Sequence, residues 1–206
     1  MKKYPQGKFY LVIVALSILV YSMLTFIQIP LICTYTIIGL NSIVYIFIYN
    51  GKLNVSKIGT SYKQTIEGKE YYRLVTSAFT HEEMWHILMN MYSLYNLGYV
   101  LENYFGSIKF FIYYIIIMLI GGVLSNCMHK QNTPYVLSIG ASGVLCGLFG
   151  MYIVLVVTHL GLQGFYSCIP TLGCLCIMTF SKRIDSIGHF SGLLVGILLG
   201  LVGLMF

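Results

Sequence analysis

Long apolar segments separated by short polar stretches make up most of this 206-residue chain. An α-helix of about 20 predominantly apolar residues crosses the hydrocarbon core of a bilayer, and seven segments approach that length. They cover residues 9–29, 31–49, 82–101, 108–126, 142–159, 161–180 and 187–206. The pattern predicts an all-α fold, a polytopic membrane helix bundle.

The longest polar stretch covers residues 50–80 and must lie outside the apolar core or at its surface. It leads into Thr80-His81-Glu82-Glu83, which fits a capping box with Thr80 as the cap and Glu83 reaching back to it. The sequence therefore predicts a helix that begins directly after Thr80.

Glycines recur at helical spacing in two of the segments. They are Gly143, Gly147 and Gly150 in one segment and Gly188, Gly192, Gly196 and Gly200 in the last. Small residues at this spacing let helix backbones approach closely in lipid. We therefore expect segment 142–159 to pack tightly on segment 187–206, which could bring Ser142 and His189 together.

The order of the segments places three helix starts at one face of the membrane. Segments 82–101, 142–159 and 187–206 are each separated from the next by one span, so they run parallel. Polar side chains gather at these three starts: His81, His86, Asn90, Ser142 and His189. Ionisable groups in membrane segments are rare and are functional candidates by default. We expect these side chains to converge at one shallow depth.

Composition supports the membrane interpretation. The chain is 58% hydrophobic and 9% charged, with a mean hydropathy of +0.83, whereas a soluble domain has about 25% charged residues. The net charge of +6 is spread over short flanking stretches and does not indicate nucleic-acid binding. Met1-Lys2-Lys3 before an apolar run resembles a signal peptide, but segment 9–29 is long and lacks a small-x-small cleavage site, which favours an uncleaved helix.

Ser142 and His189 are the candidate chemical groups, since a serine and a histidine are the minimum set for nucleophilic catalysis. The Ser142 backbone N–H would lie at a helix start, where donors are unpaired and suit a developing oxyanion. The alternatives are a small residue in a helix contact for Ser142 and a carbonyl-bonded core histidine for His189. The last segment holds no carboxylate and we expect Asp185 at the surface, so the sequence favours a pair over a triad.

The spacing of the remaining polar residues bears on metal binding and on pairing. His81 and His86 are one residue too far apart for an H-E-x-x-H motif, and on a helix they would differ by about 140°, which excludes a shared metal. His86 and Asn90 share a helix face and could donate to an oxyanion, or could form a structural hydrogen bond between helices. Arg73 and Glu102 are a possible charge pair.

Together these motifs resemble the rhomboid family of intramembrane serine proteases over residues 31–206. The motifs are Tyr72-Arg73, His81, His86-x-x-x-Asn90, Leu101-Glu102-x-x-x-Gly106, Gly140-Ala141-Ser142-Gly143 and Gly188-His189-x-x-Gly192. The resemblance implies a six-helix protease core at 31–206 and an extra hydrophobic helix within residues 1–30. It implies Ser142 as nucleophile, His189 as general base and acid, and an oxyanion hole from His86, Asn90 and the Ser142 N–H.

The resemblance also implies structural roles for Arg73 in the loop 50–80 and for six further motif residues. These are His81, Glu102, Gly140, Gly143, Gly188 and Gly192. It implies no metal or other cofactor. Substrates would be single-span transmembrane proteins, cut in or near their membrane span. The protein would lie in the lipid bilayer of the cell membrane, with its site open to the extracellular side.

Three positions depart from the family pattern. Cys146 stands where an aromatic residue often supports the histidine, Tyr72 replaces a tryptophan, and segment 9–29 precedes the six-helix core as a further span or an interfacial helix. Lysine and arginine counts also favour a cytoplasmic site, because the face opposite the site keeps only Lys109 if all seven segments span.

Two other functions remain open at this point. A non-catalytic relative that binds transmembrane clients would usually lack the serine or the histidine, and both are present. A transporter or channel would distribute ionisable groups along a path across the membrane, whereas here they gather at one face.

Overall fold

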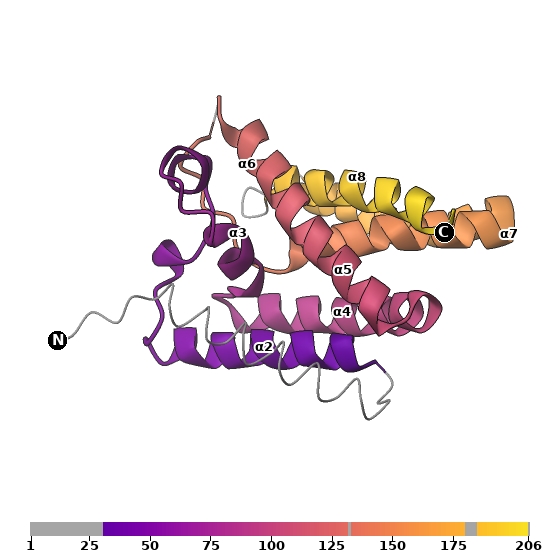
Figure 1. Ribbon diagram of the computed structural model, residues 1–206, viewed down its shortest axis with the longest axis horizontal. Coiled ribbons are helices and arrows are strands. Elements are labelled where there is room, and N and C mark those ends of the chain that lie inside the picture. Colours follow the sequence, from indigo (N-terminus) through magenta and orange to yellow (C-terminus); the bar gives the residue numbers. More distant parts are fainter. Residues whose placement is uncertain (1–30, 132, 180–184, 206) are drawn as a thin grey trace.

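The computed structural model describes residues 31–131, 133–179 and 185–205, and Figure 1 shows its helices. The predicted segment 9–29 lies outside the described residues, as do Lys182 and Arg183. Within the described ranges the chain is helical, with one isolated bridge and no strand. This confirms the predicted all-α class.

The elements follow one another along the chain with short connections. The membrane-length helices are α2 (Ile32–Tyr49), α4 (Met84–Phe105), α7 (Ser142–Thr179) and α8 (Ser186–Gly203), and α5 (Ser107–Ile116), η4 (Ile117–Gly121) and α6 (Gly122–His129) follow one another without a break. Between α2 and α4 lie η1 (Val55–Lys57), η2 (Tyr62–Glu67), α3 (Arg73–Thr76) and η3 (Ser77–Phe79).

Four helical stretches of the described chain are long and apolar enough to cross a bilayer. They are Ile32–Tyr49, Ser107–His129, Ser142–Gly173 and Ser186–Gly203. The predicted span at 82–101, which corresponds to α4, is not among them, because this helix carries several polar side chains, Asn90 and Glu102 included. The protein is therefore a multi-pass membrane helix bundle.

Helix α7 contains two of the predicted segments. Gly161 has φ 58° and ψ −139°, outside the helical region, and separates a part before it from a part after it. Glycine tolerates this positive φ because it has no Cβ. The second part returns toward the beginning of the first, since Thr171 lines a cleft together with Ser142.

Helices α7 and α8 pack against each other through glycine. A Cβ at Gly192 would overlap the Gly143 carbonyl oxygen, and one at Gly196 would overlap the Gly147 carbonyl oxygen. The close approach expected from the glycine spacing is therefore present. In Figure 1 α4, α7 and α8 all begin toward the loop-rich left-hand end.

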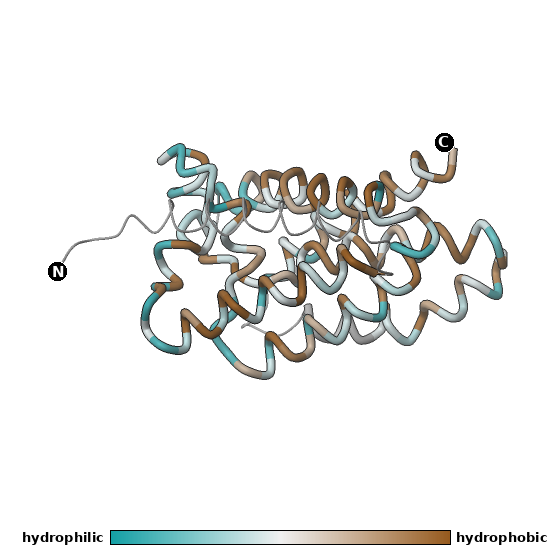
Figure 2. Tube along the Cα trace, turned by 60° about the horizontal axis from the view of Figure 1, so that its bottom comes forward, coloured by the Kyte–Doolittle hydropathy of each residue, from teal (hydrophilic) through white to brown (hydrophobic). Residues whose placement is uncertain are grey.

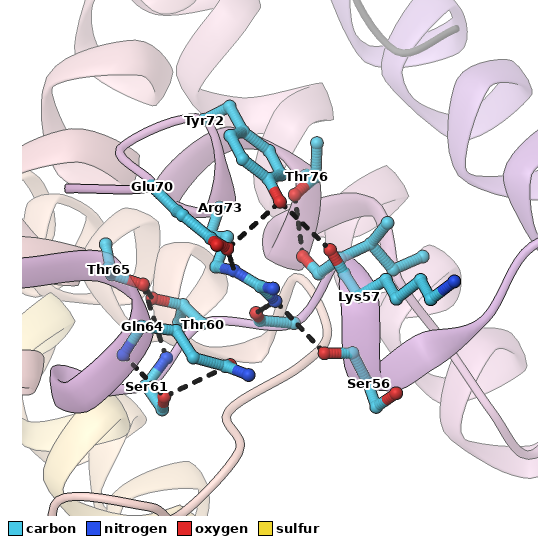
Figure 3. A network of polar contacts seen from close by, with 12 residues as sticks. Ser56, Lys57, Thr60, Ser61, Gln64, Thr65, Glu70, Tyr72, Arg73 and Thr76 are labelled. Carbon is cyan, nitrogen blue, oxygen red and sulfur yellow. Dashed lines mark hydrogen bonds and ion pairs between the residues drawn. The ribbon is translucent and has the colours of Figure 1, made fainter. Parts of the chain in front are cut away.

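Hydrophilic residues gather at that loop-rich end, whereas the helices are mainly hydrophobic (Figure 2). Arg73, only 5% exposed, ties the loop between α2 and α4 together. It donates to the Gly59 carbonyl at 2.7 Å, to the Ser56 carbonyl at 3.1 Å and to the Glu70 carboxylate (Figure 3). This pairing with the Arg73 guanidinium holds the pKa of Glu70 below its usual value.

Glu102 does not pair with Arg73, contrary to the possibility raised by the sequence. Its buried carboxylate accepts from the backbone N–H groups of Cys33 at 2.9 Å and Thr34 at 2.8 Å, and from the Thr34 and Ser107 hydroxyls at 2.6 Å each. Those two amides belong to the first turn of α2, whose donors have no partner within the helix. Glu102 therefore caps α2 from a different helix.

The predicted capping box at Thr80 is wrong. Helix α4 begins at Met84, after Glu83 in extended conformation and without a side-chain cap. The Thr80 hydroxyl instead donates to the Thr76 carbonyl at 2.8 Å. The short turn η3 uses the preceding residues, so Thr80 closes that turn and does not open the helix.

Candidate active site

Ser142 and His189 meet at the beginnings of two helices. Ser142 is the first residue of α7, and His189 lies in the first turn of α8. The His189 Nε2 atom lies 2.8 Å from the Ser142 Oγ atom, which is hydrogen-bond distance. A Cβ at Gly143 would lie 3.4 Å from the Gly188 carbonyl oxygen, so the two helix starts are in close contact beside the pair.

No carboxylate orients His189. Its Nδ1 atom is buried and has no hydrogen-bond partner among the residues that the structure describes. The nearby Asp185 accepts from the Gly188 N–H and from His129 Nε2, both at 2.9 Å, and from the Ser138 hydroxyl. Its side chain is 19% exposed, so Asp185 is partly buried. Burial raises the pKa of Asp185, but these hydrogen bonds outweigh it and hold the pKa below its usual value.

His86 and Asn90 lie beside Gly140, two residues before Ser142. Gly140 has φ 98°, and a Cβ there would lie 2.7 Å from His86 Cε1 and 3.4 Å from Asn90 Nδ2. Only glycine leaves this space open. The side chains of α4 therefore approach the backbone that leads into Ser142.

His81 holds Asn90 in this position. Its Nε2 atom lies 2.7 Å from Asn90 Nδ2 and 3.4 Å from the Ala141 backbone nitrogen. Both neighbours can only donate, so Nε2 is the acceptor and the ring proton is on Nδ1. Burial, helped by nearby His86, lowers the pKa of His81 to about 3, which keeps the ring neutral.

The rings of His81 and His86 lie close together, with centroids 4.9 Å apart. The sequence argument placed both on one helix and therefore on different faces. His81 precedes the helix, which begins at Met84, so the angle argument does not apply. No group of three or more His, Cys, Asp or Glu side chains in the described part of the chain could hold a metal ion.

Two hollows meet at Ser142 and His189. A cavity of about 70 Å³ lies toward the loops, and its polar lining includes Ser77, Ser138 and Asp185. A cleft of about 510 Å³ lies between α4 and both parts of α7. Apolar and aromatic side chains form much of it: Met89, Leu97, Val100, Leu145, Phe149 and Tyr152. Apolar residues such as Leu74 and Ile117 also line the small cavity, so the pair borders two separate hollows, one toward the loops and one between the helices.

Cys146 lies one turn after Ser142, is 6% exposed and lines the cleft. The family pattern often has an aromatic residue at this position, whereas here the side chain is a small thiol that lines the same cleft as His189. Sequence reasoning missed His129 and Ser138. The only signal that could have indicated Ser138 is its position four residues before Ser142, which matches that of Asp185 before His189.

The fold and this site define a class of protein: a multi-pass membrane helix bundle with a serine and a histidine paired at neighbouring helix starts, close to one end. A family model described as the Rhomboid domain matches residues 68–206. The chain belongs to the rhomboid family.

Curated relatives agree with this assignment. "RHOMBOID-like protein 6, mitochondrial" of Arabidopsis thaliana is 31% identical over 73% of this chain and 50% of its own length. "RHOMBOID-like protein 5" of the same plant is 32% identical over 72% of this chain and 49% of its own. "Putative rhomboid protease YdcA" of Bacillus subtilis is 28% identical over 68% and 71%. The chain spans about half the length of the two plant relatives.

Proposed function

We propose that the protein is an intramembrane serine endopeptidase that uses Ser142 as nucleophile and His189 as general base. The observation that carries the proposal is the distance of 2.8 Å between His189 Nε2 and Ser142 Oγ. A nucleophile needs a base within hydrogen-bond reach, and this pair has it. Family membership and the protease names of some relatives support the same reaction class.

The reaction follows from the positions of the atoms. His189 Nε2 takes the proton of the Ser142 hydroxyl as Oγ attacks the scissile carbonyl carbon. The same nitrogen then gives this proton to the leaving amine, and the peptide C–N bond breaks. Water, activated by His189, attacks the resulting ester, which releases the acid and restores Ser142.

The oxyanion of the tetrahedral intermediate needs donors close to Ser142. The Ser142 backbone N–H lies in the first turn of α7, where amides have no partner within the helix. The side chains of His86 and Asn90 lie beside the same segment. Because Asn90 uses one amide N–H toward His81, its second N–H remains for an oxyanion.

The apolar cleft supports a transmembrane substrate. A lipid-soluble segment could approach Ser142 between α4 and α7. The small cavity toward the loops could hold water, since about 10–15 Å³ suffices for one molecule and Ser77, Ser138 and Asp185 offer polar partners there. We propose single-span transmembrane proteins as substrates, the cell membrane as location and an extracellular opening, with no metal or other cofactor.

Substitution of Ser142 by alanine tests the proposal. Cleavage of a panel of single-span substrates in detergent should disappear, while thermal unfolding stays that of a folded protein. The control is Ser42→Ala, which removes a hydroxyl bonded to the Ile38 carbonyl on α2 and should leave cleavage unchanged. Cleavage at the original rate by Ser142→Ala would overturn the proposal. If the unmodified protein and Ser142→Ala both bind transmembrane clients and neither cleaves them, a non-catalytic client binder would be favoured.

A further inference from the structure

A second polar contact lies one helical turn before the Ser142–His189 pair. The Ser138 hydroxyl donates to the Asp185 carboxylate, and these residues precede Ser142 and His189 by four positions each. Each contact joins residues 47 positions apart. All four residues line the same small cavity, so the segments that carry the pair are tied together at two levels.

His129 ties a third element to this contact. It is the last residue of α6, its side chain is 8% exposed, and its Nε2 atom lies 2.9 Å from Asp185 Oδ1. Its Nδ1 atom contacts the Thr133 hydroxyl in the following loop. The end of α6 is therefore bonded to the Asp185 carboxylate, which also accepts the Ser138 hydroxyl.

Asp185 passes this restraint to α8. It is the N-cap residue, and its carboxylate accepts the Gly188 N–H at 2.9 Å. Its backbone carbonyl accepts the His189 N–H at 3.1 Å, which is the first hydrogen bond of the helix. The backbone of His189 is therefore fixed directly by Asp185.

Among the described residues, one hydrogen bond holds the His189 ring, the one between Nε2 and Ser142 Oγ. Its Nδ1 atom has no hydrogen-bond partner in the described part of the chain, and the position one turn after Ser142 is the small Cys146. The place of the ring then depends on the backbone of the first turn of α8. Sites lose efficiency when the groups that support their functional side chains are left free to move.

We infer that His129, Asp185 and Ser138 are positioning residues that hold the beginnings of α7 and α8 so that His189 reaches Ser142. The consequence for turnover rests on the proposed function. The spacing itself can be measured without turnover.

Three variants of α6 separate positioning from general stability. His129→Ala removes the ring. His129→Gln keeps an N–H donor near the place of Nε2 and should restore the contact with Asp185. Asn126→Ala is the matched control, because Asn126 is also buried on α6 but its amide bonds to the Thr60 hydroxyl and the Gly122 carbonyl. The bonds between Thr60 and Ser138 are made by the two backbones and do not use this amide.

The first measurement is the rate at which a fluorophosphonate labels the full-length protein in detergent. Ser142 Oγ displaces fluoride from phosphorus and its proton passes to His189, so the rate reports on the pair. His129→Ala should label about ten to a hundred times more slowly, since a misplacement of about 1 Å can cost a hundredfold. His129→Gln and Asn126→Ala should stay within about threefold of the unmodified protein. An unchanged rate in His129→Ala, or an equal loss in Asn126→Ala, would overturn the inference.

The second measurement does not need an active enzyme. The chain has five histidines, so NMR of isotope-labelled histidine can assign the His189 ring by its loss in His189→Gln. In His129→Ala the His189 Nε2 signal should move toward its position in Ser142→Ala, and in Asn126→Ala it should not move. If the unmodified protein is neither labelled nor active, the proposed function fails, and the NMR result alone decides the positioning role. A His189 signal unmoved by His129→Ala rejects that role.

Discussion

Asn90 has a fixed side chain because the neutral His81 accepts one of its N–H groups at 2.7 Å. The two residues come from different elements, the end of the loop and the second turn of α4. An amide held in this way needs little rearrangement when a charge develops beside it, which is how preorganised donors accelerate a reaction. The His81 tautomer with an unprotonated Nε2 is therefore what holds the Asn90 amide in place.

Asn90→Ala should lower kcat by about 10²–10³, the usual cost of one oxyanion donor, without abolishing cleavage. The turnover of one transmembrane substrate at saturation measures this. Asn103→Ala is the control, since Asn103 lies exposed on the same helix and its amide donates to the Tyr99 carbonyl. Equal turnover in Asn90→Ala and the unmodified protein would remove Asn90 from the oxyanion hole.

Asp185 should make stability depend on pH. Its pKa in the folded protein lies below the usual value of about 3.9, so its stabilising effect is complete above that value and is lost as the pH falls toward the folded-state pKa. The midpoint of thermal unfolding should therefore drop more steeply as the pH falls below about 4 in the unmodified protein than in Asp185→Asn. Parallel curves would contradict the assigned ionisation.

At the scale of elements, the seam between α7 and α8 decides whether the pair can form. Both helices carry glycine where their backbones touch, and Ser142 and His189 lie at the end of this seam. A wider separation of the helices would move the His189 ring away from Oγ. The distance between His189 and Ser142 therefore depends on how closely the two helices pack.

Gly192→Ala should weaken both the packing of α7 on α8 and the contact between Ser142 and His189, because the added methyl group would overlap the Gly143 carbonyl oxygen. Overpacking of this kind costs about 1–3 kcal/mol, so the unfolding midpoint should fall and cleavage should fall with it. Gly39→Ala is the control, since a Cβ there meets nothing within 4 Å and should leave both quantities almost unchanged. Unchanged unfolding in Gly192→Ala would show that the helices can separate without cost.

At the scale of the whole molecule, the polar groups gather at one end of the bundle. The loop between α2 and α4 is tied by two backbone hydrogen bonds, at 3.0 and 2.8 Å, between Thr60 and Ser138 in the loop before Ser142. The polar end is therefore a connected structure around the site. Helix α8 begins at the site end and ends at Gly203 at the opposite end of the bundle, so the side of the membrane that holds the end of α8 reports the side on which the site opens.

With an extracellular site, a reporter fused to Phe206 should be cytoplasmic. Lysine and arginine counts favour the reverse, although Arg73 is buried and held by Glu70 and two carbonyls. Paired fusions, one to a reporter active only inside the cell and one to a reporter active only outside, measure the side. Activity of the external reporter would overturn the proposed orientation.

Much of the helix architecture was predictable because its causes are local. Hydropathy over about 20 residues marked the long helices, and glycine spacing marked the α7–α8 seam. The start of α4 was not predicted, because the Thr80 motif closes a turn that the preceding residues form. The predicted relation between His81 and His86 was wrong for the same reason. It assumed that the helix includes His81, whereas the helix begins at Met84.

The amino-acid sequence by itself determined the class of the protein, the pairing of its glycine-rich helices and the end of the bundle where its polar residues gather. These follow from composition and periodicity, which act over neighbouring residues. Only the tertiary structure decided that Glu102 caps α2, that α7 reverses at Gly161, and that His129 and Ser138 hold Asp185. Such contacts join residues far apart in the chain, and they depend on side-chain direction and loop path, which local patterns do not encode.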